Sequence, residues 1–126
     1  MDWRILVVDD DPDLLNTLAR LLGRSGYTCL TASSGSDGIR VIEAGGIDLV
    51  VTDLHMPGAD GLAVMRSVRT HVPPIPVILM TAYPTAGTQR EEGPLIRLAK
   101  PFASSQFLEA VRLALGSRLC CPSPER

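Results

Sequence analysis

Short apolar runs alternate along the chain with segments in which apolar residues recur at helical spacing. Three runs are continuous enough to predict strands that are buried on both faces of a sheet, at residues 4–9, 47–53 and 75–81. Two weaker runs predict further strands at residues 27–31 and 95–98. Helices are predicted between and after these strands, around residues 14–22, 39–42, 62–68 and 107–115. This order of elements is typical of an α/β protein whose parallel sheet carries helices on both faces.

Capping and helix-breaking residues sharpen these boundaries. Asp11 is predicted to cap the first helix, because an aspartate side chain accepts hydrogen bonds from the first N–H groups of a helix. Ser104 is predicted to cap the last helix, and Gly116 to end it. The segment 83–94 contains two Pro and two Gly, both of which disfavour helix interiors. We therefore expect the fourth crossover helix to be short or disordered.

The length of 126 residues fits a single domain. We predict that this domain spans residues 1–116. Residues 117–126 carry two Pro and no periodicity, and are predicted to form a flexible tail or the start of a linker.

Composition excludes several classes of function. The net charge of −2 gives no basic field, so we expect no direct nucleic-acid binding by this segment. No apolar run approaches the roughly 18–20 residues of a membrane span, and the N-terminus does not have the pattern of a secretory signal. The three cysteines, at positions 29, 120 and 121, show neither a disulfide framework nor metal-ligand spacing. We expect a cytoplasmic protein with reduced thiols and no membrane contact.

Side chains that can do chemistry stand at the ends of the predicted strands. The set consists of Asp9, Asp10, Asp53, Thr81 and Lys100. Parallel strands bring their carboxyl ends to one edge of the sheet, where open α/β sheets bind ligands. Lys100 is the only lysine among twelve basic residues, which argues that a compact positive charge is needed at this point.

A cluster of this kind suits a divalent cation and a phosphoryl group. Neighbouring carboxylates resist ionisation unless a cation lies between them, and Mg²⁺ prefers oxygen ligands beside a phosphate. An ammonium and a hydroxyl can contact phosphoryl oxygens, and a carboxylate can itself accept the phosphoryl group as an aspartyl phosphate. These residue types therefore point to Mg²⁺-dependent phosphoryl transfer.

Four motifs at these strand ends, in this order, resemble the receiver domain of bacterial two-component response regulators. They are Val-Val-Asp-Asp-Asp at 7–11, Val-Thr-Asp-Leu-His-Met-Pro-Gly-Ala-Asp-Gly at 51–61, Val-Ile-Leu-Met-Thr-Ala at 77–82 and Lys-Pro-Phe at 100–102. The resemblance covers residues 4 to about 116. It implies a doubly wound, flavodoxin-like sheet of five parallel strands in the order 2-1-3-4-5, with helices on both faces.

The resemblance also implies how the phosphoryl group is received. Asp53 would be the phosphoacceptor, and Thr81 and Lys100 would contact the phosphoryl group. The Lys100–Pro101 peptide would be cis. The donor would be a phosphohistidine on a sensor histidine kinase or a phosphotransfer protein. The domain would be a regulatory phosphoacceptor and not an enzyme, with at most slow self-catalysed phosphotransfer and dephosphorylation.

The metal site follows from the same resemblance. Mg²⁺, or Mn²⁺ in its place, would be held by the carboxylates of Asp10 and Asp53 and by the backbone carbonyl of His55. Asp9 would act mainly through bound water.

One position departs from the family pattern and leaves other functions open. Receiver domains usually have an aromatic residue three positions before the lysine, whereas this chain has Arg97. The first alternative is a receiver-like interaction module that signals without phosphorylation through the surface of helix four and strand five. That surface could also form a homodimer. A remote alternative is an aspartate-nucleophile phosphohydrolase. Such enzymes carry a second acid two residues after the nucleophile, and the presence of His55 at that position argues against this alternative.

Overall fold

The computed structural model describes residues 3–53, 61–69, 75–81 and 95–120. Its sheet has five parallel strands in the order β2-β1-β3-β4-β5. The strands are β1 (Arg4–Val8), β2 (Thr28–Ala32), β3 (Leu49–Asp53), β4 (Val77–Thr81) and β5 (Leu95–Ala99). The helices of the described residues are α1 (Pro12–Arg24), α2 (Gly35–Ala44), α3 (Gly61–Arg69) and α4 (Ser104–Cys120). The predicted fold class and strand order are confirmed.

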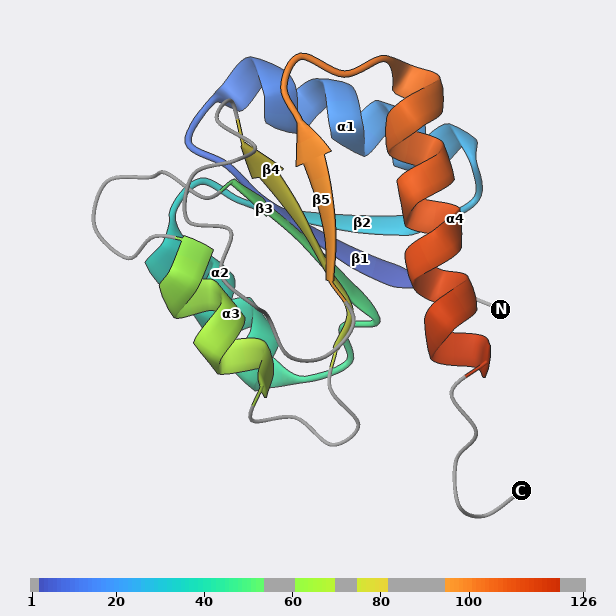
Figure 1. Cartoon of the computed structure of the whole chain (residues 1–126). Coiled ribbons are helices and arrows are strands. Elements are labelled where there is room, and N and C mark those ends of the chain that lie inside the picture. The colour runs from blue at the N-terminus through green and yellow to red at the C-terminus, as the bar shows by residue number, and fades with distance from the viewer. Residues whose placement is uncertain (1–2, 54–60, 70–74, 82–94, 121–126) are drawn as a thin grey trace.

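Helices cover both faces of the sheet (Figure 1). Helices α1 and α4 lie on one face, where Leu18 of α1 and Phe107 of α4 join the same buried apolar cluster. Helices α2 and α3 lie on the other face, where Ile42 and Val64 belong to a second cluster. The sheet is therefore buried on both sides, as the continuous apolar runs predict.

The alternation of side chains along β1 shows this two-sided burial. Ile5 and Val7 belong to the cluster beneath α1 and α4, whereas Leu6 and Val8 belong to the cluster beneath α2 and α3. All four side chains are fully buried. Because each strand residue points to the face opposite that of its neighbour, a strand between two helical layers must be apolar at every position.

Helix α1 begins at the cap predicted from the sequence. Asp11 has an extended backbone, and its carboxylate accepts a hydrogen bond of 3.0 Å from the N–H of Asp13. Pro12 occupies the first helical position, where the missing N–H has no helical partner to lose. The helix ends at Arg24, and two residues later Gly26 has a φ of +90°, a conformation that favours glycine. The boundary of α1 thus follows from local sequence.

Helix α2 approaches β1 closely because it carries a glycine at the contact. Gly38 is buried, and a Cβ atom built on it would lie 2.8 Å from Cγ2 of Val8. The helix begins after Ser34, whose hydroxyl accepts a hydrogen bond of 3.1 Å from the N–H of Asp37. The glycine therefore sets how near this helix lies to the central strand.

The last helix, labelled α4, differs from the sequence prediction at both ends. Ser104 is the first helical residue, and the cap position is Ala103, whose carbonyl accepts from the N–H of Phe107. The N–H of Ala103 donates a hydrogen bond of 2.8 Å to Oε1 of Gln106. A glutamine inside the helix therefore supplies the capping contact. The helix also continues through Gly116, because one glycine costs a helix only about 1 kcal/mol.

Several predictions fall wholly or partly outside the described residues. The segment 83–94, and with it the expected fourth crossover helix, is one of them. Another is His55. The predicted tail 117–126 is helical as far as Cys120, and its remainder also lies outside, so the domain limit at residue 116 stays a prediction. No helix in the described part of the chain is long and apolar enough to cross a membrane.

Candidate functional site

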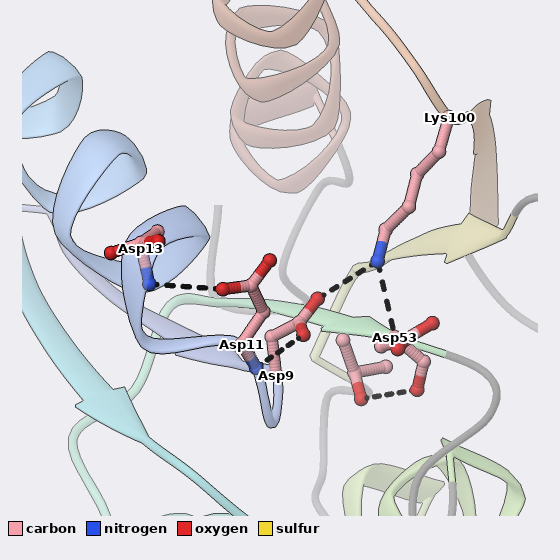
Figure 2. Close-up of polar contacts among 6 residues, drawn as sticks. Asp9, Asp11, Asp13, Asp53 and Lys100 are labelled. Carbon is pink, nitrogen blue, oxygen red and sulfur yellow. Dashed lines mark hydrogen bonds and ion pairs between the residues drawn. The ribbon is translucent and has the colours of Figure 1, made fainter.

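The carboxyl edge of the sheet gathers most of the predicted set. Asp53 and Thr81 are the last residues of β3 and β4, and Asp9 and Lys100 directly follow β1 and β5. Figure 2 shows the Lys100 side chain reaching across this edge toward Asp9 and Asp53. Residues that are far apart in the sequence therefore meet because parallel strands end on the same side.

Lys100 bridges two carboxylates. Its Nζ lies 3.0 Å from Oδ2 of Asp9 and 3.6 Å from Oδ2 of Asp53. Asp9 is 1% exposed and Asp53 is 8% exposed, whereas a quarter of the Lys100 side chain reaches solvent. Because burial reduces screening by water, these ion pairs are stronger than pairs on the surface.

Both oxygens of Asp9 are engaged. Oδ2 accepts the hydrogen bond from Lys100, and Oδ1 accepts a second one of 2.9 Å from the N–H of Asp11. The N–H of Asp9 itself donates to the carbonyl of Ala32 at the end of β2. Asp9 is thus fixed by its neighbours on two strands and in the turn before α1.

The electrostatics of this pair follow from burial and from the ions that face each other. Burial raises the pKa of the Asp9 carboxyl, and the hydrogen bonds from the N–H of Asp11 and from Lys100 offset that effect only in part. Burial also lowers the pKa of Lys100, but the bond to Asp9 and the charges of Asp9 and Asp53 outweigh it. The pKa of the Lys100 ammonium therefore lies above its ordinary value. The site holds a firmly charged amine against a carboxylate that resists ionisation.

Three carboxylates at this edge can share one cation. Oxygens of Asp9, Asp10 and Asp53 lie within 4.8 Å of one another. Asp10 is exposed, so the cluster opens to solvent on that side. One ammonium does not neutralise three carboxylates, and an all-oxygen donor set fits Mg²⁺ or Mn²⁺, with water completing the coordination. The residues present therefore fit the predicted metal.

Thr81 lies where the sequence places it, at the end of the strand next to Asp53. In the register of β3 and β4, Asp53 pairs with Met80, the residue just before Thr81. Thr81 is fully buried, and its carbonyl accepts a hydrogen bond of 2.8 Å from the N–H of Lys100. The backbone of Thr81 therefore anchors the residue that carries the amine.

A cleft of about 420 Å³ lies beside the loop that carries Lys100. It is lined by Asp11, Leu14, Lys100, Pro101 and Phe102. The peptide between Lys100 and Pro101 is cis, as the resemblance implies. No role is predicted for Phe102 from the sequence. Its position directly after Lys100 and Pro101 is the feature of the sequence that points to this cleft.

These features define a doubly wound α/β domain that carries a cluster of acids and one amine at the carboxyl edge of its sheet. The model of the response regulator receiver domain family matches residues 5–112. Because this match covers most of the chain, the chain belongs to the family of response regulator receiver domains. Domains of this family are regulatory rather than enzymatic.

Relatives of known identity agree with this assignment. Transcriptional regulatory protein GlrR of Escherichia coli is 37% identical over 114 residues, which are 88% of this chain and 26% of GlrR. Response regulator MprA of Mycobacterium ulcerans is 35% identical over 118 residues, which are 91% of this chain and 51% of MprA. The chain thus spans about a quarter of the length of GlrR and about half of that of MprA.

Solved structures share the fold. A response regulator receiver domain protein of Clostridium thermocellum matches with a TM-score of 0.82 at 30% identity, covering 92% of this chain and 96% of that one. The receiver domain of sensor histidine kinase PA1611 of Pseudomonas aeruginosa matches with a TM-score of 0.81 at 25% identity, covering 92% and 99%. In that structure a magnesium ion is coordinated in the active site cleft.

Proposed function

We propose that Asp53 accepts a phosphoryl group from a phosphohistidine of a sensor histidine kinase or a phosphotransfer protein. A carboxylate oxygen of Asp53 forms the new bond to phosphorus. The bond between phosphorus and the imidazole nitrogen breaks, and its electron pair stays on nitrogen. The observation that carries this proposal is the ammonium of Lys100, 3.6 Å from Asp53 beside a cluster of three carboxylates.

Lys100 and Thr81 are proposed to contact the transferred group. The Lys100 ammonium already lies within ion-pair distance of the acceptor, so a phosphoryl oxygen bound to Asp53 comes within its reach. The backbone of Thr81 fixes Lys100, and the hydroxyl of Thr81 is proposed to donate to another phosphoryl oxygen. The same arrangement supports slow loss of the phosphoryl group to water.

Asp9, Asp10 and Asp53 are proposed to hold the Mg²⁺ ion, with Mn²⁺ as a substitute. The bound ion supplies positive charge that offsets the charge on the phosphoryl oxygens and the acceptor. Both oxygens of Asp9 are already engaged, which supports contact through bound water rather than direct ligation. The backbone carbonyl of His55 completes the proposed set as implied by the resemblance.

The setting of the domain is also a proposal. We place it in the cytoplasm, where it reports its phosphorylation state to an output partner or segment and touches neither nucleic acid nor membrane. A homodimer is one form that this report can take, and the mass in solution before and after phosphorylation tests it.

The alternative, an interaction module that signals without phosphate, is favoured by one observation. Half-buried Arg97 on β5 pairs in register with Leu79 and occupies the position where the family has an aromatic ring.

The experiment that tests the proposal is intact mass spectrometry after incubation with Mg²⁺ and acetyl phosphate. One added phosphoryl group is expected on the wild type, and none on Asp53→Asn or in the presence of a chelator. The matched control is Asp37→Asn, which removes an exposed aspartate that pairs with Arg40 on α2. This control should be modified like the wild type. No modification of any form contradicts the proposal and favours the interaction module, and rapid turnover of phosphomonoesters would indicate a phosphohydrolase.

A further inference from the structure

A four-residue loop joins β5 to α4, and hydrogen bonds hold it at both ends. At its start, the N–H of Lys100 donates to the carbonyl of Thr81 at 2.8 Å. At its end, the N–H of Ala103 donates to Oε1 of Gln106 at 2.8 Å, and the carbonyl of Ala103 accepts from Phe107 at 3.1 Å. Between these two ends, the loop is anchored by side-chain packing.

The anchor is a stacked pair of rings. The ring of Phe102 lies 5.9 Å from that of Phe107, at an interplanar angle of 17°. Phe107 is fully buried on α4, in the apolar cluster between this helix, α1 and the sheet. Phe102 is half-buried against the same cluster, and it is the one large apolar side chain of the loop. The loop is therefore tied to the core through Phe102.

The position of this loop decides where the amine lies. The Lys100 side chain is long and has many rotamers, so its reach depends on where its backbone is held. Its ammonium contacts Asp9 at 3.0 Å and Asp53 at 3.6 Å, and small displacements change both distances. Phe102 follows two residues later and lines the same cleft as Lys100.

We propose that Phe102, stacked on Phe107, is a positioning residue that holds Lys100 within reach of Asp9 and Asp53. Phe102 touches no reacting atom and acts through the backbone of the loop. The consequence for phosphorylation rests on the proposed function, whereas the placement of the amine does not.

The placement can be observed directly, because Lys100 is the only lysine in the chain. Protein labelled with ¹³Cε-lysine gives one lysine signal, recorded at neutral pH without divalent cation. In Phe102→Ala the signal should move toward the position of free lysine, and in Phe102→Tyr, which keeps the ring, it should stay as in the wild type. The matched control is Leu108→Ala, which removes a half-buried side chain of α4 that packs against the same cluster as Phe102. Its signal should not move.

Phe102→Leu provides a second variant that keeps most of the apolar volume but cannot stack, so a folding failure of the alanine variant does not end the test. An unmoved lysine signal in Phe102→Leu, or an equal movement in Leu108→Ala, overturns the proposal whether or not the domain is phosphorylated.

Phosphorylation by acetyl phosphate with saturating Mg²⁺ gives the functional readout. Loss of the ring should lower the rate constant about tenfold, which is less than the roughly 100-fold that a misplacement of about 1 Å can cost. In a Lys100→Met background, Phe102→Leu should cause no further loss. An equal further loss in that background would show that Phe102 acts independently of Lys100, and would overturn the proposal.

Discussion

The amine of Lys100 lies closer to Asp9 than to the proposed acceptor Asp53. Its Nζ is 3.0 Å from Asp9 Oδ2 and 3.6 Å from Asp53 Oδ2, although Lys100 and Asp9 are 91 residues apart in the sequence. The ammonium therefore compensates the most deeply buried carboxylate of the cluster. A divalent ion that joins the same acids has to share Asp9 with Lys100.

Replacing Lys100 by Met should strengthen Mg²⁺ binding while slowing phosphorylation. Without the ammonium, the three carboxylates lose the positive charge that Lys100 places 3.6 Å from Asp53. A unit charge at a distance of about 4 Å is worth at least about 1 kcal/mol. We expect the Mg²⁺ affinity to rise on the order of tenfold, measured by titration calorimetry. The rate with acetyl phosphate should fall, because the phosphoryl oxygens lose their contact with the amine.

The matched control for that change is Arg112→Met. Arg112 is an exposed cation that pairs with Glu109 on the outer side of α4. Its removal changes the net charge equally but should leave the Mg²⁺ affinity within about twofold, since exposed charges are screened. Equal effects of the two substitutions would show that Lys100 does not compete with the ion at the cluster.

The pH dependence of stability should reveal the cost of ionising Asp9. The pKa of Asp9 is raised in the folded protein above about 3.8, the ordinary aspartate value. As the pH rises above that value, Asp9 therefore keeps its proton more often in the folded state than in the unfolded state. Without Mg²⁺, the free energy of unfolding of the wild type should therefore fall with rising pH relative to Asp9→Asn. Urea unfolding followed by the fluorescence of Trp3, the only tryptophan, measures this difference.

The difference in free energy of unfolding between wild type and Asp9→Asn should stop growing once the pH has passed the raised pKa of Asp9. Saturating Mg²⁺ should reduce this difference. A wild type that gains stability over Asp9→Asn across the same range would show that the ion pair with Lys100 outweighs the burial of the carboxylate.

A methyl group at position 38 should destabilise the fold. The Cβ of Gly38→Ala would lie 2.8 Å from Cγ2 of Val8, closer than side-chain atoms pack, and overpacking of this kind costs about 1–3 kcal/mol. The control is Gly23→Ala in α1, whose Cβ meets nothing within 4 Å. That change should be neutral or stabilise by up to about 1 kcal/mol, because alanine is the better helix former. Urea unfolding measures both, and equal stabilities would contradict close packing of α2 on β1.

The thiol of Cys29 should react slowly in the folded protein. Burial raises the pKa of Cys29 to about 11, two pH units above its ordinary value. At pH 8 the reactive thiolate is therefore roughly a hundredfold scarcer than in an exposed cysteine. In a Cys120→Ser, Cys121→Ser background, iodoacetamide should modify Cys29 about 100-fold more slowly in the native protein than in urea. Similar rates in both states would contradict burial of the thiol.

Much of this structure can be predicted from the sequence, because strands that are buried on both faces of a sheet are continuous apolar runs. Runs such as 47–53 predict central strands, and the alternation with helices predicts a parallel sheet. The strand order came with the resemblance and not from the pattern. The meeting of Asp9, Asp53 and Lys100 follows from topology alone, since each stands at a strand end.

The rest depends on geometry that local sequence does not encode. The preference of Lys100 for Asp9 depends on side-chain positions fixed by three strands. The capping of α4 through Gln106 was missed because the expected cap, Ser104, has the better local propensity. The stack of Phe102 on Phe107 is a contact between a loop and a helix, and local sequence does not encode it.

The central claim is that the folded edge makes Asp53 the residue that carries the phosphoryl group. Borohydride reduction of the protein, after treatment with acetyl phosphate and Mg²⁺, converts an aspartyl phosphate into homoserine, which peptide mass spectrometry locates. The account predicts homoserine at position 53 in the wild type, and much less of it in Lys100→Met. Homoserine at another aspartate, or none at all under conditions that phosphorylate a known receiver domain, would contradict it.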